Sequence, residues 1–294
     1  MTDFTAPILP NETATIQEIL DRRKREFERR DAARRARHLV DVQVKIDGPY
    51  GICHFGDPHV DDPGTDISLL ERHVSVVAQT RGMYAGNIGD NNNNWIGRLE
   101  RLHSKQGTTA KEAWALVEWL MTAMPWLYVI HGNHGAWSGD GNPLDWILRN
   151  APGVTGIWGV RLNLISPNGS AVRINARHDF AGNSMWNEIH GPKKAAKMGW
   201  RDHILVCGHK HTSGYGMDRC PATGLISHII RVAGYKVHDD YAEQLGLPNQ
   251  ASFPSCVTII DPDEPDDSIR RITFMPDVEL GADYLTWLRR KKGY

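Results

Sequence analysis

The chain has 294 residues, of which 40% are hydrophobic and 23% are charged, a composition typical of a globular protein. It carries 34 basic and 35 acidic residues, so its net charge of −1 excludes an overall basic field that would attract nucleic acid or an acidic membrane. No apolar run approaches the roughly 20 residues that span a bilayer, and residues 1–11 lack the order of a secretory signal. We therefore expect a cytoplasmic protein without a membrane partner.

The N-terminal segment is highly charged and predicts a helix over 13–38. Pro10, Asn11 and Thr13 supply a start signal, and the apolar positions are too few for a buried helix. One interpretation is a basic arm that contacts nucleic acid or a protein partner. The other, which interspersed acidic residues favour, is a solvated helix. We assign 1–38 as a charged N-terminal helical extension.

The segment from 40 to 150 predicts alternating strands and helices. Alternation over 40–46 and the apolar run 50–55 indicate two strands, and an amphipathic helix at 65–80 leads to a strand at 83–88. This β-α-β order favours parallel strands with a right-handed crossover. The expected elements that follow are a loop at 91–95, helices at 96–103 and 109–124, a strand at 126–130 and a short helix at 143–150.

From 157 onward the pattern changes to consecutive strands. Strands at 160–165 and 171–176 flank the hairpin turn Pro167-Asn168-Gly169. Further strands are expected at 203–207, 226–232, 256–260 and 269–274, with helices at 190–198 and 279–294. Because no internal repeat or long linker interrupts the chain, we predict one main domain over 39–278, followed by a C-terminal helix with a basic end over 279–294.

Side chains suited to metal binding follow five of the predicted strands. They belong to Asp57 and His59, Gly89-Asp90, Gly132-Asn133-His134, His178, and Gly208-His209-Lys210-His211. Ligands of open α/β sheets bind at the carboxyl ends of the strands, so we expect these side chains to converge. Carboxylate, amide and imidazole groups together suit two divalent cations that share one carboxylate.

With the motifs D-x-H, G-D, G-N-H, a lone H and G-H-x-H in this order, the chain resembles the calcineurin-like metallophosphoesterase superfamily. The resemblance covers roughly residues 50–215. It implies an α/β fold: a four-layer α/β/β/α sandwich of two mixed β-sheets flanked by helices. The two metal sites that it implies are Asp57, His59, Asp90 and His211 for one ion, and Asp90, Asn133, His178 and His209 for the other. Manganese is the expected metal, and iron, zinc, nickel or cobalt also suit these ligands.

The resemblance assigns His134 a catalytic role. This imidazole faces the phosphate and gives a proton to the leaving oxygen, while a metal-bridging hydroxide attacks the phosphorus. The family commonly has an acidic residue after the histidine to orient it, and this chain has Gly135. We therefore expect weaker activation of His134, unless Asp140 replaces the missing carboxylate.

Four histidines can be assigned either as metal ligands or to other roles. His178 ends a predicted strand, as the other ligands do, whereas His190 competes for the same role and is kept as a candidate substrate contact. His54 and His131 precede the motif loops inside predicted strands, so we expect them to be hydrogen-bonded side chains rather than ligands.

The substrate class is narrowed by missing motifs. The run Gly89-Asp90-Asn91-Asn92-Asn93-Asn94-Trp95 lacks the G-D-x-x-D-R-G of protein Ser/Thr phosphatases, and the D-x-H pair does not fit purple acid phosphatases. Phosphodiesterases, nucleases and small-molecule pyrophosphatases remain. Trp95, Trp137 and Trp186 follow the motifs and are candidates to stack a nucleobase, or simply to pack loops.

Three functions therefore stay open. The favoured one is a dinuclear-metal-dependent hydrolase for a phosphodiester of nucleic acid or a nucleotide. The alternatives are a phosphomonoesterase or pyrophosphatase for a small metabolite, and a non-catalytic binding scaffold, which Gly135 favours slightly. The sequence indicates no particular protein partner.

Overall fold

The computed structural model describes residues 13–239 and 253–294 together with positions 3, 5, 7, 243 and 246, and for Arg98, Lys105 and Asp140 it describes the backbone alone. Pro10, Asn11 and the side chain of Asp140 thus lie outside the described part. The chain divides into two compact units, Met1–Val40 and Asp41–Tyr294.

The first unit contains the helix α1 (Ile16–Ala36). Thr15 and Glu18 form a capping box at its start, in which each side chain bonds the other residue's backbone N–H. None of its residues is buried, and its charges pair within the helix, as in Arg23 with Glu26 at 2.8 Å. Such exposed pairs contribute little to stability.

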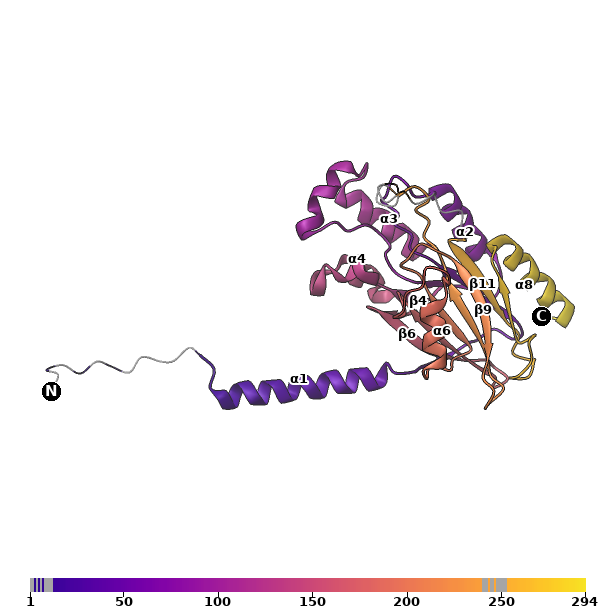
Figure 1. The fold of residues 1–294 in the computed structure, drawn as a ribbon, viewed down its shortest axis with the longest axis horizontal. Coiled ribbons are helices and arrows are strands. Elements are labelled where there is room, and N and C mark those ends of the chain that lie inside the picture. Colours follow the sequence, from indigo (N-terminus) through magenta and orange to yellow (C-terminus); the bar gives the residue numbers. More distant parts are fainter. Residues whose placement is uncertain are drawn as a thin grey trace. The chain divides into compact units, whose positions relative to one another are not determined.

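The larger unit is built on two six-stranded sheets, which include all strands that the structure describes (Figure 1). In order across the first sheet, sheet A, the strands are β1 (Val40–Gln43), β6 (Gly159–Ile165), β7 (Ala171–Arg177), β8 (Ile204–Cys207), β10 (Ile226–Arg231) and β9 (Gly214–Arg219). In sheet B they are β12 (Ile272–Met275), β11 (Ser255–Ile260), β2 (Tyr50–Phe55), β3 (Met83–Asn87), β4 (Trp126–Ile130) and β5 (Val154–Gly156).

Both sheets are mixed. In sheet B the strands β2, β3, β4 and β5 run parallel, while β11 is antiparallel to β2 and β12. In sheet A the strands β7, β8 and β10 run parallel, while β6 and β9 pair antiparallel at either side of them. The carboxyl ends of the parallel strands share one edge of each sheet, which is where loops build ligand sites.

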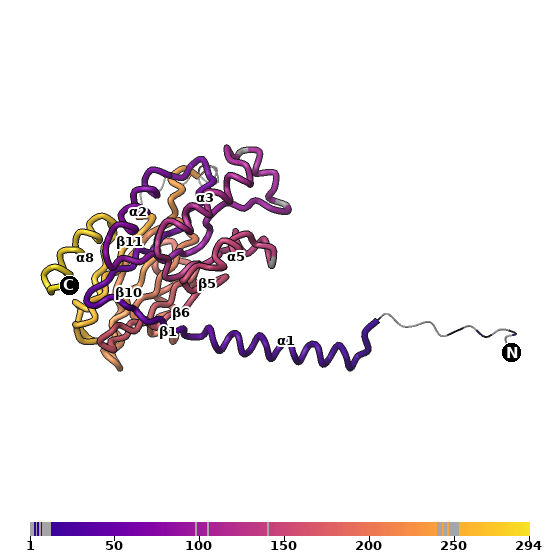
Figure 2. Tube along the Cα trace, turned by 180° about the vertical axis from the view of Figure 1, so that it is seen from behind, coloured from indigo at the N-terminus to yellow at the C-terminus, as the bar shows by residue number. Residues whose placement is uncertain are grey.

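Helices cover the outer faces of the two sheets (Figures 1 and 2). Sheet B packs against α2 (Ile67–Gln79), α3 (Ala110–Thr122) and α8 (Val278–Lys292) in the larger hydrophobic core. Sheet A packs against α6 (His190–Lys197) through a smaller core. The short elements between β3 and β5 are η1 (Gly97–Lys105), α4 (Gly132–Ala136), η2 (Gly139–Gly141), α5 (Pro143–Ile147) and η3 (Leu148–Asn150). The predicted α/β architecture of two mixed sheets flanked by helices is confirmed.

Helix boundaries follow from side-chain caps. Asp66 accepts the backbone N–H of Leu69 at the start of α2, and Asp277 accepts that of Leu280 at the start of α8. The helix α8 ends at Gly293, whose φ of 84° is accessible to glycine at little cost. None of the helices in the described residues is sufficiently long and apolar to cross a membrane.

Several boundaries differ from the sequence prediction. The first strand ends at Gln43 rather than at 46, because Val44 already bonds to Ile165, the last residue of its neighbour β6. The strands β5 and β9 were not predicted. The sequence of β9 is rich in glycine and polar residues, and pairing with β10 and the stacking of Tyr215 on Phe274, at 3.9 Å between ring centroids, determine its conformation. Tertiary contacts here override local propensity.

Candidate metal centre

All seven predicted ligands lie in one cluster at the carboxyl ends of strands from both sheets, six of them on loops and Asn133 in the first turn of α4. Asp57 and His59 follow β2, Asp90 follows β3 and Asn133 follows β4, while His178 follows β7 and His209 and His211 follow β8. The cluster therefore lies where the two sheets meet. Of the seven, Asp57, His59, Asp90 and His178 are almost completely buried.

One part of the cluster consists of Asp57, His59 and His211. Each contributes one ligand atom, and these atoms lie within 4.8 Å of one another. The Nε2 atom of His211 is 3.3 Å from Oδ2 of Asp57. His59 also belongs to a group with Asp90 and His134, so Asp90 connects to this part through His59.

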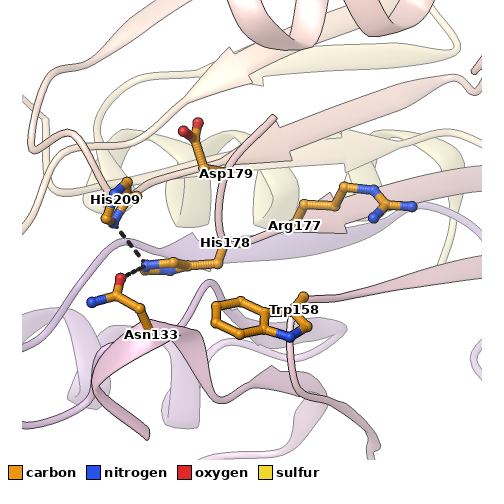
Figure 3. Close-up of a pocket in the computed structure, with 6 residues that line it drawn as sticks. All are labelled: Asn133, Trp158, Arg177, His178, Asp179 and His209. Atoms are coloured by element: carbon orange, nitrogen blue, oxygen red, sulfur yellow. Dashed lines mark hydrogen bonds between the residues drawn. The ribbon is translucent and has the colours of Figure 1, made fainter. Parts of the chain in front are cut away.

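The other part consists of Asp90, His178 and His209. Asn133 lies beside the two histidines (Figure 3). The Nε2 atom of His178 lies 2.7 Å from Oδ1 of Asn133 and 3.0 Å from Nδ1 of His209. It also lies 3.2 Å from Oδ2 of Asp90. One ring nitrogen offers either one proton or one lone pair, so it cannot satisfy three partners. Atoms that converge in this way are arranged like the ligands of a cation.

Two further atoms of the cluster lack hydrogen-bond partners. Oδ1 of Asp57 and Nδ1 of His59 are buried and unpaired among the described residues. Leaving such a group unsatisfied costs roughly 1–3 kcal/mol, and a coordinated cation removes that cost. The carboxylate, amide and imidazole donors also suit divalent transition metals. The residues present therefore fit a divalent-metal site.

The ligand loops have a conformation that most residues avoid. His59, Asp90, His209 and His211 have φ angles of 40°, 49°, 67° and 50°. Outside glycine, this left-handed region costs of order 1–3 kcal/mol per residue and is concentrated at functional sites. The sharp turns bring side chains that follow a strand back over its end.

Motif glycines make room for the same turns. A Cβ atom on Gly132 would lie 2.2 Å from Oδ1 of Asp90, and one on Gly208 would lie 2.9 Å from Oδ1 of Asp57. The glycines before Asn133 and His209 are thus required by the close approach of a carboxylate.

The electrostatics of the cluster keep Asp90 ionised. Burial alone would raise its pKa, but the hydrogen bond from His178 and nearby imidazole charges together lower the pKa below its usual range. Burial likewise opposes the charged form of His178, but its hydrogen bond to Asp90 and the charge of Asp57 raise its pKa to about 9. The buried carboxylates thus favour positive charge at this position, whether a proton or a metal ion supplies it.

His134 faces the same cluster from α4. Its backbone N–H donates to Oδ1 of Asp90 at 3.0 Å, and its Nδ1 is 2.6 Å from the carbonyl oxygen of Asn93. Its Nε2 is 3.8 Å from Oδ2 of Asp90. The ring of Trp137 lies 4.3 Å from the His134 ring and that of Trp95 lies 5.2 Å from it, centroid to centroid. The structure thus brings two of the three candidate tryptophans to His134.

The remaining substrate-binding candidates lie elsewhere. Trp186 is 90% exposed. His190 begins α6 and lines a separate cavity of about 290 Å³ with Lys193, Lys194, Lys197 and Met198. His54 and His131 are not in the metal-ligand groups: His54 bonds to Tyr128 and Thr258, at 2.7 and 2.8 Å, and His131 contacts Asn142 and Asp145.

Sequence reasoning missed several residues at the cluster. Trp158, Arg177 and Asp179 line a cavity of about 230 Å³ together with Asn133, His178 and His209 (Figure 3). Arg177 and Asp179 flank His178 in the sequence, which could have indicated them. Trp158 lies 20 positions before His178 and comes close only through the pairing of β6 with β7.

Arg231 also escaped prediction. It is completely buried at the end of β10, where its guanidinium donates to the carbonyl oxygen of Gly208, to that of Glu188 at 2.7 Å and to Oδ1 of Asp179 at 2.9 Å. Arg231 thereby holds the loop that carries His209. An arginine inside an apolar strand has no sequence signal for this role.

The fold and the cluster define an α/β protein of two mixed sheets with metal-ligand side chains where the sheets meet. No family model and no curated protein matches the sequence. Among solved structures, the chain is similar to vacuolar protein sorting 29 from Cryptosporidium parvum, at 11% identity and a TM-score of 0.42, over 78% of this chain and 96% of that one. It is also similar to a single mutant of Vps29 from Entamoeba histolytica, at 12% identity and a TM-score of 0.36, over 76% and 96%.

Proposed function

We propose that the chain is a dinuclear-metal-dependent phosphoesterase of the calcineurin-like type, which hydrolyses a phosphodiester of a nucleic acid or a nucleotide. The observation that carries this proposal is that the seven side chains of the five ordered motifs form one cluster, with the Nε2 atom of His134 facing it. Manganese is the metal that we expect.

The cluster divides naturally into two sites. Asp57, His59 and His211 would hold one cation, and Asn133, His178 and His209 the other. Asp90 belongs to one group of candidate ligands with His59 and to another with His178 and His209. This position suits a carboxylate that would offer one oxygen to each cation. A bound pair would lower the pKa of a water molecule and neutralise charge on the phosphate oxygens.

His134 would supply the proton for the leaving oxygen. Its Nδ1 proton is committed to the carbonyl oxygen of Asn93, so in the protonated imidazole Nε2 is the nitrogen that would deliver a proton toward the cluster. The rings of Trp95 and Trp137 pack beside it.

Two features favour a diester of a nucleoside as the substrate. The Asn91–Asn94 run replaces the D-R-G of protein phosphatases, and aromatic side chains border the proton donor. Aromatic rings next to a phosphate-cleaving centre suit substrates that carry bases.

The test is hydrolysis by the full chain supplied with Mn²⁺, comparing bis-p-nitrophenyl phosphate with p-nitrophenyl phosphate. We expect two bound metals per chain, faster turnover of the diester, and loss of both metal and activity in Asp90→Asn. His38→Gln, which changes an exposed histidine that belongs to none of the ligand groups, serves as the control and should retain both.

Each other outcome selects another function. Faster turnover of the monoester would favour a phosphomonoesterase. Two bound metals without hydrolysis of any phosphoester would favour a non-catalytic binding scaffold.

A further inference from the structure

A second cavity lies beside His134 and is distinct from the one in Figure 3. Its volume is about 670 Å³, and it is lined by Ile96, Gly97, Leu99, Arg101 and Trp137. Trp137 connects it to the cluster, because its ring lies 4.3 Å from that of His134. A group bound in this cavity would therefore lie next to the proton donor.

Among the described side chains, the walls of this cavity are formed by apolar and aromatic residues and by the cationic Arg101. Ile96 and Trp137 are each 38% exposed, which leaves apolar surface available to a ligand. The ring centroids of Trp95 and Trp137 are 6.3 Å apart, at an interplanar angle of 29°. Trp95 thus packs against one side of the Trp137 indole. The volume falls within the roughly 300–1,000 Å³ that is typical of small-molecule sites.

The rim of the cavity is open. Gly97 has a φ of 59°, and a Cβ atom there would meet nothing within 4 Å. Arg101 places a positive charge at the same cavity, which suits a ligand whose flat apolar part continues into a phosphate chain. A nucleobase within a nucleotide or oligonucleotide has this combination of properties.

We propose that this cavity binds the base of the leaving nucleoside, stacked on Trp137. The inference rests on the proposed function. In that reaction the oxygen of a water molecule forms a new bond to phosphorus and one water proton is released to solvent, the bond from phosphorus to the leaving oxygen breaks, and the protonated imidazole of His134 passes its Nε2 proton to that oxygen. Whatever is attached to the leaving oxygen must therefore extend from His134, and Trp137 is the wall beside it.

The experiment compares a dinucleotide with two analogues, each of which lacks one base, using the full chain supplied with Mn²⁺. The products identify the leaving nucleoside. We expect kcat/KM to fall about 5- to 150-fold when the base on the leaving side is removed, the factor that stacking of one base provides. Removing the other base should have a smaller effect.

Variants separate base binding from a structural role. Trp137→Ala should abolish the preference for the leaving base, and Trp137→Phe should retain part of it. Leu99→Trp, which fills the cavity while Trp137 stays in place, should also abolish it. Trp146→Ala removes a tryptophan that is 70% exposed on α5 and outside this cavity, so it should leave the preference unchanged.

Binding provides a readout that does not depend on turnover. By calorimetry, AMP should bind more tightly than ribose 5-phosphate to the wild-type chain and equally weakly to Trp137→Ala. Equal turnover of the dinucleotide and its analogues, together with equal binding of the two phosphates, would overturn the base site and leave phosphodiester hydrolysis standing. If no phosphodiester is cleaved at all, the proposed function fails, and the AMP comparison still decides whether the cavity binds a base.

Discussion

The Nδ1 atom of His134 donates a hydrogen bond to the backbone carbonyl oxygen of Asn93 at 2.6 Å. A carbonyl oxygen only accepts, so this bond fixes the proton of the neutral imidazole on Nδ1 and leaves Nε2 toward Asp90. The side chain of Asn94 supports the same turn by donating to the carbonyl oxygen of His134 at 2.7 Å. The asparagine run thus orients His134 without an acidic neighbour.

Replacing His134 should remove the proton donor and spare the metal site. For His134→Asn we expect kcat to fall by about 10²- to 10⁴-fold, the usual contribution of general acid catalysis. Metal content, measured by elemental analysis, should stay at the wild-type value, and His38→Asn, which changes an exposed histidine outside the ligand groups, should retain full activity. A loss of metal as large as in Asp90→Asn would instead make His134 a ligand.

An acidic residue at position 135 should not improve the enzyme. A Cβ atom on Gly135 would lie 3.1 Å from Cβ of His131, so Gly135→Asp crowds a buried position and places a charge there. Because Nδ1 of His134 already has an acceptor, we expect a lower Tm without a gain in kcat/KM.

The control for this change is Gly141→Asp. A Cβ atom at Gly141 meets nothing within 4 Å, so thermal melting of that variant should match the wild type. A rise in kcat for Gly135→Asp would show that Asn93 does not orient His134 adequately.

Removing the guanidinium of Arg231 should destabilise the chain and weaken metal binding. Arg231→Met removes the guanidinium donors to Asp179 and to two carbonyl oxygens, and breaking a buried ion pair costs about 3–5 kcal/mol. Since Asp179 is partly exposed, we expect the free energy of unfolding, measured by urea denaturation, to decrease by about 3 kcal/mol, the lower end of this range.

Two comparisons make the role of Arg231 specific. Arg231→Lys keeps the charge but cannot reach all three acceptors. Its free energy of unfolding should therefore lie between those of the wild type and Arg231→Met. Arg72→Met breaks an exposed pair with Glu279 and should change stability by less than about 1 kcal/mol. Equal effects of Arg231→Met and Arg72→Met would contradict the role assigned to Arg231.

Mild acid should destabilise the fold. Burial lowers the pKa of His73, His203 and His228 to about 4 in each case, while an unfolded histidine has a pKa near 6.5. Between these values the unfolded chain binds more protons than the folded one, so the free energy of unfolding falls as pH falls from about 6.5 to about 4.

Urea denaturation at several pH values in this window measures the effect. In His228→Gln the dependence on pH should be shallower, because one of these groups no longer takes up a proton on unfolding. A free energy of unfolding that stays constant across the window would contradict this assignment.

The sequence predicted the ligand loops well because their residues obey local rules. Gly132 and Asp90 each lie two positions after an apolar run, and their close contact requires a glycine at position 132. Arg231 and Trp158 could not be predicted in the same way. Their proximity to the cluster depends on strand pairing between distant segments, and their neighbours in sequence carry no sign of it. Whether Trp186 and His190 contact substrate stays a prediction.

The order of the strands within the two sheets could not be predicted from the sequence either. The strand β2 leads to Asp57, yet its partner β11 comes near the end of the chain, and β1 joins the sheet formed mostly by later strands. Pairings between segments so far apart leave no local pattern, whereas each strand alone shows its own periodicity.

The pairing of β2 with the distant strand β11 has a consequence for synthesis on the ribosome. The strand that presents Asp57 remains an open edge on one side until residues 255–260 have emerged, because they form its partner β11. Nascent chains should consequently be vulnerable to aggregation until that pairing has formed.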